Sequence, residues 1–165
     1  MESDAFQDYA RSRLDRLRRT AYLLCGNWHT ADDLTSIVLS KLYRKWRRIS
    51  TLDEPDAYVR KMLLRAWLDE LRRPWRRERA TATPPDRPDE SAADPTERMA
   101  LLSLLNELPP RRRAVIVLRY FNDLSVEDTA EALGCSTGTV KSQTARALDS
   151  LRERLSPRLA AARKC

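Results

Sequence analysis

The sequence predicts an all-α protein with two small helical domains, residues 1–78 and 96–165, joined by a flexible Pro-rich acidic linker, residues 79–95. Three glycines and 7% aromatic residues in 165, with abundant Leu, Ala and Arg, favour helices over strands. Apolar residues recur at helical spacing on both sides of the linker. The linker itself holds four prolines, four acids and two arginines and has no large apolar residue, so it cannot join a core.

The charge of the chain favours a polyanionic partner, with nucleic acid as the first candidate. Thirty-one basic residues against 24 acidic ones give a net charge of +7 and a pI near 9.7. No apolar run approaches the roughly 20 residues of a membrane span. Because the N-terminus also lacks the pattern of a signal peptide, we expect a cytoplasmic protein without membrane insertion.

The first domain begins with an amphipathic helix over residues 4–25, which Gly26 and Asn27 should end. Thr30 with Asp33 resembles a capping box and predicts the start of a second helix, which continues through Trp46. Leu39, Tyr43 and Trp46 widen the apolar arc of this helix beyond one core contact. Either this surplus is a partner surface or neighbouring helices cover both sides, and the pattern favours neither.

A third helix should follow a short polar loop at residues 49–54, with Pro55 in its first turn. It is expected to run to about Arg73 and to expose a basic face. Cations interleaved with Tyr58, Trp67 and Trp75 suit contact with phosphates and stacking on bases, and a solvated basic face is the weaker interpretation.

The second domain should open with Asp94 as an N-cap and a helix that ends at Pro109-Pro110. A helix over residues 110–121 is expected to turn Phe121 inward and to display a set of arginines. These arginines are Arg111, Arg112, Arg113 and Arg119.

Residues 124–148 predict a helix-turn-helix. Ser125 suits an N-cap and Gly134 a left-handed helix end, and Ser136 suits the N-cap of a second helix that should stop near Ser156-Pro157. Polar residues in the first turns of that helix can pair with base edges and phosphates. An ordinary helical hairpin with a solvated polar face is the alternative. Gly138 lowers helix stability by about 0.5 to 1 kcal/mol relative to Ala, and it either lets a phosphate approach or is incidental.

Catalytic and metal-binding patterns are absent from the sequence. Cys25, Cys135 and Cys165 are far apart, and His29 has no nearby ligand partner, so neither a metal site nor a cofactor is expected. We interpret Cys25 and Cys135 as small apolar residues near helix ends. Without a Gly-rich phosphate loop or a His beside a nucleophile, the sequence does not predict an enzyme.

Several motifs together resemble the extracytoplasmic-function class of bacterial sigma factors, in the sigma-70 family. The first domain contains Ala31-Asp32-Asp33-Leu34, Tyr58-Val59-Arg60 and Asp69-Glu70-Leu71-Arg72-Arg73. The second runs from Leu108-Pro109 through Gly138-Thr139-Val140-Lys141-Ser142 to Arg146-Ala147-Leu148, and the match spans residues 5 to about 155. Ser36 and Ile37 stand where the family often has Gln and Glu, and Arg65 where it often has Asn.

The resemblance implies a promoter-specificity subunit that binds core RNA polymerase, through its large catalytic and flap-bearing subunits, and promoter DNA. An anti-sigma factor is a further possible partner. The residues that would bind core polymerase are Asp32, Asp33, Leu34, Leu39, Tyr43 and Trp46. The residues that would open and read the minus-10 element are Leu52, Asp53, Tyr58, Arg60, Arg65, Asp69, Arg72 and Arg73. The residues that would read the minus-35 duplex are Arg112, Ser136, Thr137, Thr139, Lys141, Ser142, Gln143 and Arg146.

A stand-alone helix-turn-helix regulator that binds duplex operators as a dimer is the alternative function. Against it, the first domain shows neither a ligand-pocket or phosphoacceptor signature nor a heptad repeat for dimerisation. A sigma factor would instead use that domain for polymerase and melted DNA.

Overall fold

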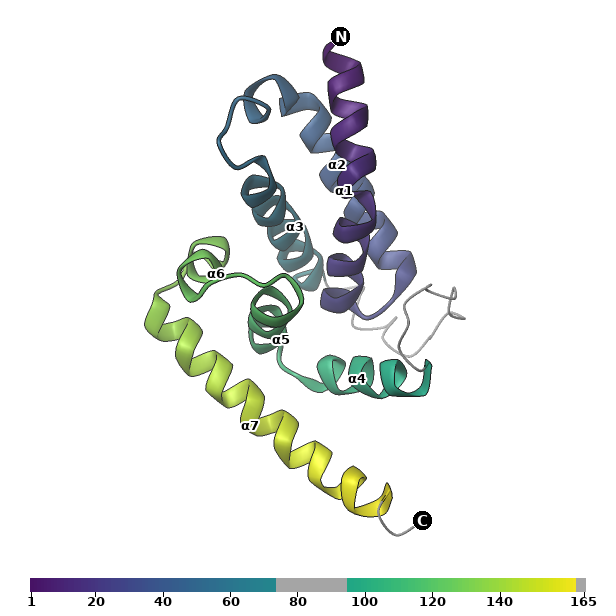
Figure 1. Cartoon of the computed structure of the whole chain (residues 1–165), viewed down its shortest axis with the longest axis vertical. Helices are drawn as coiled ribbons and strands as arrows, with labels where there is room; N and C mark the ends of the chain where they lie inside the picture. The colour runs from purple at the N-terminus through teal and green to yellow at the C-terminus, as the bar shows by residue number, and fades with distance from the viewer. Residues whose placement is uncertain (74–94, 163–165) are drawn as a thin grey trace. The chain divides into compact units, whose positions relative to one another are not determined.

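The computed structural model describes residues 1–73 and 95–162, which form helices and short connections without a strand in either range (Figure 1). The chain divides into two compact units, Met1–Asp89 and Glu90–Cys165. The division falls inside the predicted linker, of which all but Pro95 lies outside the described residues. The predicted all-α class is confirmed.

The first unit consists of three helices. They are α1 (Glu2–Cys25), α2 (Trp28–Ile49) and α3 (Pro55–Leu71). α1 packs along α2, and both contact α3 (Figure 1). The largest fully buried side chains of this unit include Leu24, Leu34, Leu42, Leu63 and Trp67. Pro55 occupies the first turn of α3, as predicted.

The turn between α1 and α2 departs from its predicted capping. Gly26 ends α1 in the left-handed conformation, with φ 82°. Asn27 then caps α2, because its side chain accepts a hydrogen bond from the Thr30 backbone N–H at 2.8 Å. The expectation that Thr30 starts this helix is therefore wrong. Thr30 lies inside the first turn and is 4% exposed, and its own backbone N–H is the group that the Asn27 side chain caps.

The second unit also consists of packed helices. They are α4 (Pro95–Glu107), α5 (Pro110–Ile116), α6 (Val126–Leu133) and α7 (Thr137–Ala162). α7 contacts both α5 and α6, and Val115, Ala130 and Val140 form a small core between them. The predicted helix-turn-helix thus rests on α5.

α5 continues as a π-helical segment, Val117–Phe121, which the sequence pattern did not predict. The wider turn is closed by the bond from the Asn122 N–H to the Val117 carbonyl, at 3.1 Å. An extra residue in one turn rotates the following side chains out of the apolar stripe. Phe121 is therefore 41% exposed, and the expectation that it points inward is wrong.

Two arginines that were expected on the surface instead hold backbone carbonyls. Pro109 and Pro110 have no N–H, so they cannot donate to the last carbonyls of α4. The Arg113 guanidinium donates there, to the carbonyls of Leu105, Asn106 and Leu108. Arg119 similarly donates to the Leu124 carbonyl at 2.6 Å. Arg113 and Arg119 thus bind backbone carbonyls in the turns before and after α5. The expectation that the helix displays them on its surface is wrong.

α7 extends through Pro157 to Ala162, beyond its predicted end at Ser156-Pro157. A proline inside a helix removes one backbone donor. Here the carbonyl without its donor is that of Glu153, four residues earlier, and Glu153 is exposed to water. The loss is therefore small enough for α7 to continue.

Candidate nucleic-acid interface

The turn of the helix-turn-helix has a complete set of hydrogen bonds. Gly134 has φ 65°, the Cys135 N–H donates to the Ala130 carbonyl at 3.0 Å, and the Gly134 N–H donates to the Glu131 carbonyl at 3.3 Å. This pair of bonds is the Schellman arrangement, which usually includes an apolar contact after the glycine. Cys135 makes that contact by packing against the Val115, Ala130 and Val140 core. The turn is therefore rigid, and Cys135 serves it as a small apolar side chain.

Both helices of the motif have side-chain caps, as predicted. Ser125 Oγ accepts from the Asp128 N–H at 3.0 Å. Ser136 Oγ accepts from the Thr139 N–H at 3.1 Å and lies 2.9 Å from Thr139 Oγ1. Ser136 and Thr139 thus have structural roles at the start of α7 in addition to their predicted place in the interface.

α7 has a buried face and an outer face. Val140 and Ala147 are fully buried, whereas Gly138, Ser142 and Ala145 lie along the exposed side. The two cations Lys141 and Arg146 are five residues apart, about 140° around the helix, and so flank this exposed strip. The predicted minus-35 residues exposed on α7 are Thr137, Lys141, Ser142 and Arg146.

Two other predicted minus-35 residues are placed differently. The amide oxygen Oε1 of Gln143 is buried, with no hydrogen-bond partner among the described residues. Gln143 therefore turns toward the packed side of α7, and its expected place among the base-facing residues is not supported by its orientation. Arg112 is half-buried on α5, a different helix from the exposed strip.

Gly138 lies at the centre of the exposed strip and has no packing reason to be glycine. A Cβ built on it would meet only Ser136 Oγ, at 3.8 Å, and its φ is not in the left-handed region. An approaching partner therefore finds bare backbone here, which alanine would cover by one methyl group.

The predicted polymerase residues on α2 divide into exposed and buried ones. Asp33 is exposed, and Asp32 accepts a hydrogen bond from Arg18 Nε of α1 at 2.7 Å. Tyr43 is 58% exposed, and Leu39 is half-buried. All four side chains lie at least partly exposed on one helix, although Asp32 is paired with Arg18 and Asp33 Oδ2 lies 3.7 Å from His29 Nε2.

Leu34 and Trp46 belong to the core. Leu34 is 1% exposed and Trp46 is 9% exposed. The Trp46 ring packs against Phe6 and Tyr9 of α1, with ring centroids 5.7 and 4.9 Å apart. The expectation that Trp46 widens an exposed apolar surface is wrong, because the N-terminal turns of α1 cover that side of α2.

α3 presents an outer face to which several predicted minus-10 residues contribute. Arg65, Asp69 and Arg72 are exposed at helical spacing, with Tyr58 half-buried on the same side. Leu52 and Asp53 are exposed in the loop that precedes α3, and Arg73 is exposed just after it.

Two α3 side chains do not join that face. Arg60 is five residues from Arg65 and therefore about 140° away around the helix, on the side that faces Asp56. Trp67 is 1% exposed, so the expectation that it stacks on bases is wrong. Trp75, the other predicted stacking residue, lies outside the described residues.

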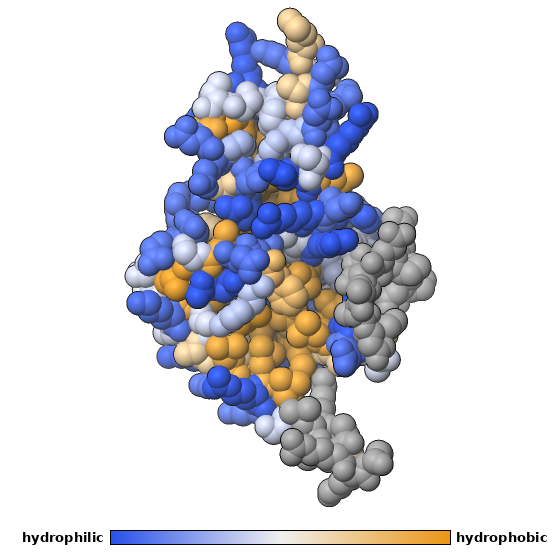
Figure 2. Space-filling view, viewed as in Figure 1, coloured by the Kyte–Doolittle hydropathy of each residue, from blue (hydrophilic) through white to orange (hydrophobic). Residues whose placement is uncertain are grey.

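The second unit also exposes apolar side chains, and Figure 2 shows apolar surface on it in the face toward the viewer. Met99 and Leu101 of α4 are 61% and 41% exposed, and Leu155 of α7 is 38% exposed. Arg154 of α7 forms an ion pair with Glu107 of α4, which ties these two helices together. These exposed apolar side chains are candidate contacts for another protein.

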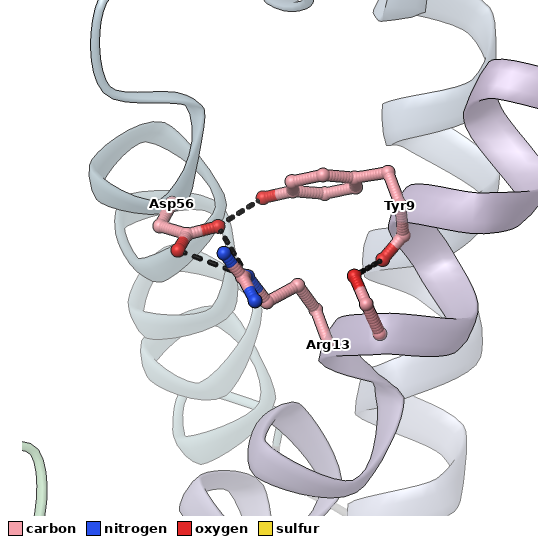
Figure 3. A network of polar contacts seen from close by, with 4 residues as sticks. Tyr9, Arg13 and Asp56 are labelled. Atoms are coloured by element: carbon pink, nitrogen blue, oxygen red, sulfur yellow. Dashed lines mark hydrogen bonds and ion pairs between the residues drawn. The ribbon is translucent and has the colours of Figure 1, made fainter.

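A polar network that the sequence analysis missed links α1 to the start of α3 (Figure 3). The Tyr9 hydroxyl donates to Asp56 Oδ1 at 2.5 Å, and Arg13 Nε lies 3.1 and 3.0 Å from Oδ1 and Oδ2. Tyr9 and Arg13 are four residues apart and share a face of α1, but the sequence contains no signal that pairs them with a residue over 40 positions away.

The network shifts the pKa of its members. Burial, followed by the hydrogen bond to Asp56 and the charge of that residue, raises the pKa of Tyr9 well above its ordinary value. Burial alone would raise the pKa of Asp56, but the hydrogen bonds from Tyr9 and Arg13 and the charges of Arg13 and Arg60 outweigh it and hold that pKa below its ordinary value. Asp56 is therefore ionised and Tyr9 protonated at neutral pH.

The described ranges hold no cluster of His, Cys, Asp or Glu that could bind a metal ion. No helix within them is both long and apolar enough to cross a membrane.

Comparisons with known proteins cover both units. Residues 9–77 match the family model for sigma-70 region 2, and residues 98–151 match the model for sigma-70 region 4. The chain is 38% identical over 158 residues to the RNA polymerase sigma-E factor of Streptomyces avermitilis, covering 93% of this chain and 86% of that protein. The chain is 37% identical to the RNA polymerase sigma-E factor of Streptomyces coelicolor, covering 91% of this chain and 85% of that protein. The ECF RNA polymerase sigma factor SigE of Mycolicibacterium smegmatis is 31% identical, covering 92% and 62%.

Solved structures show the same fold. The sigma factor RpoE of Bartonella quintana, solved in complex with the anti-sigma factor NepR, has a TM-score of 0.76 at 24% identity, covering 92% of this chain and 96% of that one. CnrH, solved in complex with the cytosolic domain of CnrY, has a TM-score of 0.67 at 21% identity, covering 94% and 90%. The family models and the sequence relatives together show that this chain belongs to the extracytoplasmic-function class of the sigma-70 family of RNA polymerase sigma factors.

Proposed function

We propose that this sigma factor binds core RNA polymerase and divides promoter recognition between its two predicted domains, residues 1–78 in the first unit and 96–165 in the second. The second unit reads the minus-35 duplex with the outer face of α7. The first unit binds polymerase with α2 and captures unstacked minus-10 bases with the loop 50–54 and the outer face of α3. The predicted linker, residues 79–95, connects the two functions. The chain acts by binding, with no catalysis of its own.

The exposed strip of α7 is the observation that carries the minus-35 assignment. A capped recognition helix on a rigid turn presents Thr137, Ser142 and bare backbone at Gly138, with Lys141 and Arg146 on the two flanks. Small polar residues suit base edges, and cations on the flanks suit the phosphates along both sides of a major groove. An ordinary hairpin would not need cations on both flanks.

The minus-10 assignment rests on the first unit. Unstacking a base costs a few kcal/mol, which a binding site must offset. Leu52 and Asp53 in the exposed loop and Tyr58 on α3 offer contacts for a displaced base, while Arg65 and Arg72 lie on the same side for phosphates. Arg60 and Trp67 lie elsewhere and are left out of this site.

The protein partners follow from the exposed α2 and second-unit surfaces. Asp33, Leu39 and Tyr43 would contact the large catalytic subunit of polymerase, with Asp32 beside them. Exposed apolar side chains of the second unit, among them Met99, Leu101 and Leu155, would contact the flap-bearing subunit. An anti-sigma factor would inhibit the protein by covering the same apolar residues. We expect the protein to act in the cytoplasm, where core polymerase and promoters are found.

The test is to add the purified chain to sigma-free bacterial core polymerase and to map transcription start sites on genomic DNA of the source organism. A one-to-one complex that starts transcription at discrete sites is the expected result. If the core does not bind the chain, while the chain alone binds duplex DNA as a dimer, the stand-alone regulator is the correct function.

A further inference from the structure

The loop 50–54 has both of its ends attached to one residue of α1. The Tyr9 ring packs on Trp46, in the last turn of α2, with centroids 4.9 Å apart. The Tyr9 hydroxyl donates to Asp56, the second residue of α3, at 2.5 Å. Tyr9 therefore spans the loop from its entry to its exit.

The hydrogen bonds of the loop itself are local. The Leu52 N–H donates to the Ile49 carbonyl at 3.1 Å, and the Thr51 hydroxyl donates to the Arg48 carbonyl at 2.8 Å. On the other side, Glu54 caps α3 without a side-chain hydrogen bond. Each of these bonds stays on one side of the loop, so none of them fixes the distance between its ends.

Arg13 strengthens the connection at Asp56. Its Nε lies within 3.1 Å of both carboxylate oxygens, and a bond between two charged groups is stronger than a neutral one. Asp56 is also in the first turn of α3, where a negative charge is favourable. The ionised carboxylate is thus held from two directions, by the helix start and by α1.

We propose that Tyr9 and Arg13 are positioning residues, which fix the loop 50–54 through Asp56 in the conformation that receives an unstacked promoter base. This inference rests on the proposed function of the loop. Neither residue touches DNA in this role.

The physical benefit is preorganisation. A mobile loop loses conformational entropy when it binds, and that loss weakens binding. The side chains of Leu52 and Asp53 are exposed, and the one backbone bond of Leu52 reaches only Ile49, on the entry side of the loop. Holding the two ends in advance removes part of this entropy loss.

The experiment uses holoenzyme reconstituted with Tyr9→Phe or Arg13→Gln. Tyr9→Phe keeps the ring against Trp46 and removes only the hydroxyl. The probe is a fluorescent single-stranded oligonucleotide that carries the minus-10 sequence of a promoter found by start-site mapping. Losing a hydrogen bond to a charged group should weaken binding of this oligonucleotide by about five- to twentyfold. Affinity for the minus-35 duplex and for core polymerase should not change.

Val38→Ala is the matched control for a general loss of stability. It removes methyl groups from a fully buried position of α2 outside the network, so it should lower the melting temperature at least as much as Tyr9→Phe. It should leave oligonucleotide affinity at the wild-type value. Arg13→Lys keeps the charge but replaces the planar guanidinium with an ammonium on a flexible stem, so its affinity should lie between those of wild type and Arg13→Gln.

Leu52→Ala separates this inference from the proposed function. If Leu52→Ala weakens oligonucleotide binding while Tyr9→Phe and Arg13→Gln do not, the loop captures DNA but the positioning role is wrong. If Leu52→Ala also binds like wild type, base capture by the loop fails, and the positioning role fails with it. If Val38→Ala weakens binding as much as Tyr9→Phe, the network is only structural.

Discussion

Arg18 of α1 and Asp32 of α2 form an ion pair, with 2.7 Å between Arg18 Nε and Asp32 Oδ1. The Arg18 guanidinium also lies over the Trp28 ring, 5.1 Å from its centroid. Asp32, one of the residues proposed to contact polymerase, therefore already has a cation beside its carboxylate in the free sigma factor. A polymerase cation must compete with Arg18 for Asp32.

Arg18→Gln should raise affinity for core polymerase. Partly exposed ion pairs are worth roughly 0.2–1 kcal/mol, so removing this competitor should strengthen binding by about 1.5- to 5-fold. Fluorescence titration of labelled sigma factor with core polymerase measures the change. Asp32→Asn should weaken binding in the same assay. A weaker complex with Arg18→Gln would show that the pair instead holds Asp32 in its binding orientation.

Trp46→Ala should destabilise the first unit. Truncating a buried Trp typically costs about 3–5 kcal/mol, and Trp46 supports Phe6 and Tyr9. Urea unfolding followed by circular dichroism gives the change. Tyr43→Ala, at an exposed position on the same helix, should keep most of the stability and weaken polymerase binding. Wild-type stability in Trp46→Ala would contradict the buried position of this residue.

Gly138→Ala should raise the stability of the fold and weaken the binding of minus-35 DNA. Alanine favours the helix by about 0.5–1 kcal/mol, and its methyl group meets only Ser136 Oγ in the free protein. The melting temperature should therefore rise. If the minus-35 duplex approaches the backbone here, holoenzyme affinity for that duplex should fall at least threefold, by roughly 0.7 kcal/mol. A rise in both quantities would mean that this glycine is incidental.

Lys141→Ala and Arg146→Ala should each weaken minus-35 binding and make it less dependent on salt. A lost phosphate contact lowers the slope of log affinity against log salt by about 0.9. Anisotropy titrations of holoenzyme with a minus-35 duplex at several salt concentrations give this slope. Arg152→Ala is the control, because Arg152 is exposed further along α7 and is paired with Asp149 at 3.6 Å. An equal loss of slope in Arg152→Ala would indicate nonspecific attraction.

The stability contributed by the Tyr9 and Asp56 bond should disappear at both ends of the pH range. The folded pKa of Asp56 lies below 3.8, so its contribution is complete above that value and is lost as pH falls through the folded pKa. The folded pKa of Tyr9 lies above 10.0, so its contribution is complete below pH 10.0 and is lost as pH rises toward the folded pKa. The difference in unfolding free energy between wild type and Tyr9→Phe should thus be constant from about pH 5 to 9. A difference that varied within this window would assign the effect to other groups.

Local signals in the sequence were sufficient for most helix boundaries. Ser125, Gly134 and Ser136 act within four residues of themselves, and each has its predicted role. The predicted start of α2 is wrong because Asn27 directly follows Gly26, so by sequence it resembles part of the previous helix end. Its side chain serves the next helix instead.

Long-range contacts were harder to predict. Trp46 looked surplus because periodicity along α2 cannot show that Phe6 and Tyr9 cover it. The widened turn before Asn122 likewise has no signal in the apolar spacing of the sequence. The network around Asp56 joins two helices whose relative register no local pattern encodes. For the proposed interface, helical spacing identified the exposed α7 residues but not the inward turn of Gln143.

The arrangement of Arg113 around the end of α4 has a consequence for comparing and transplanting these sequences. Pro109-Pro110 and Arg113 act as one unit, because the prolines create the shortage of donors and the guanidinium supplies them. Lysine keeps the charge but has a single nitrogen, which cannot reach three carbonyls in the same way. A chimera that exchanges second units should therefore place its junction before Pro109 or after Arg113. Homologues that lose the prolines become free to lose this arginine.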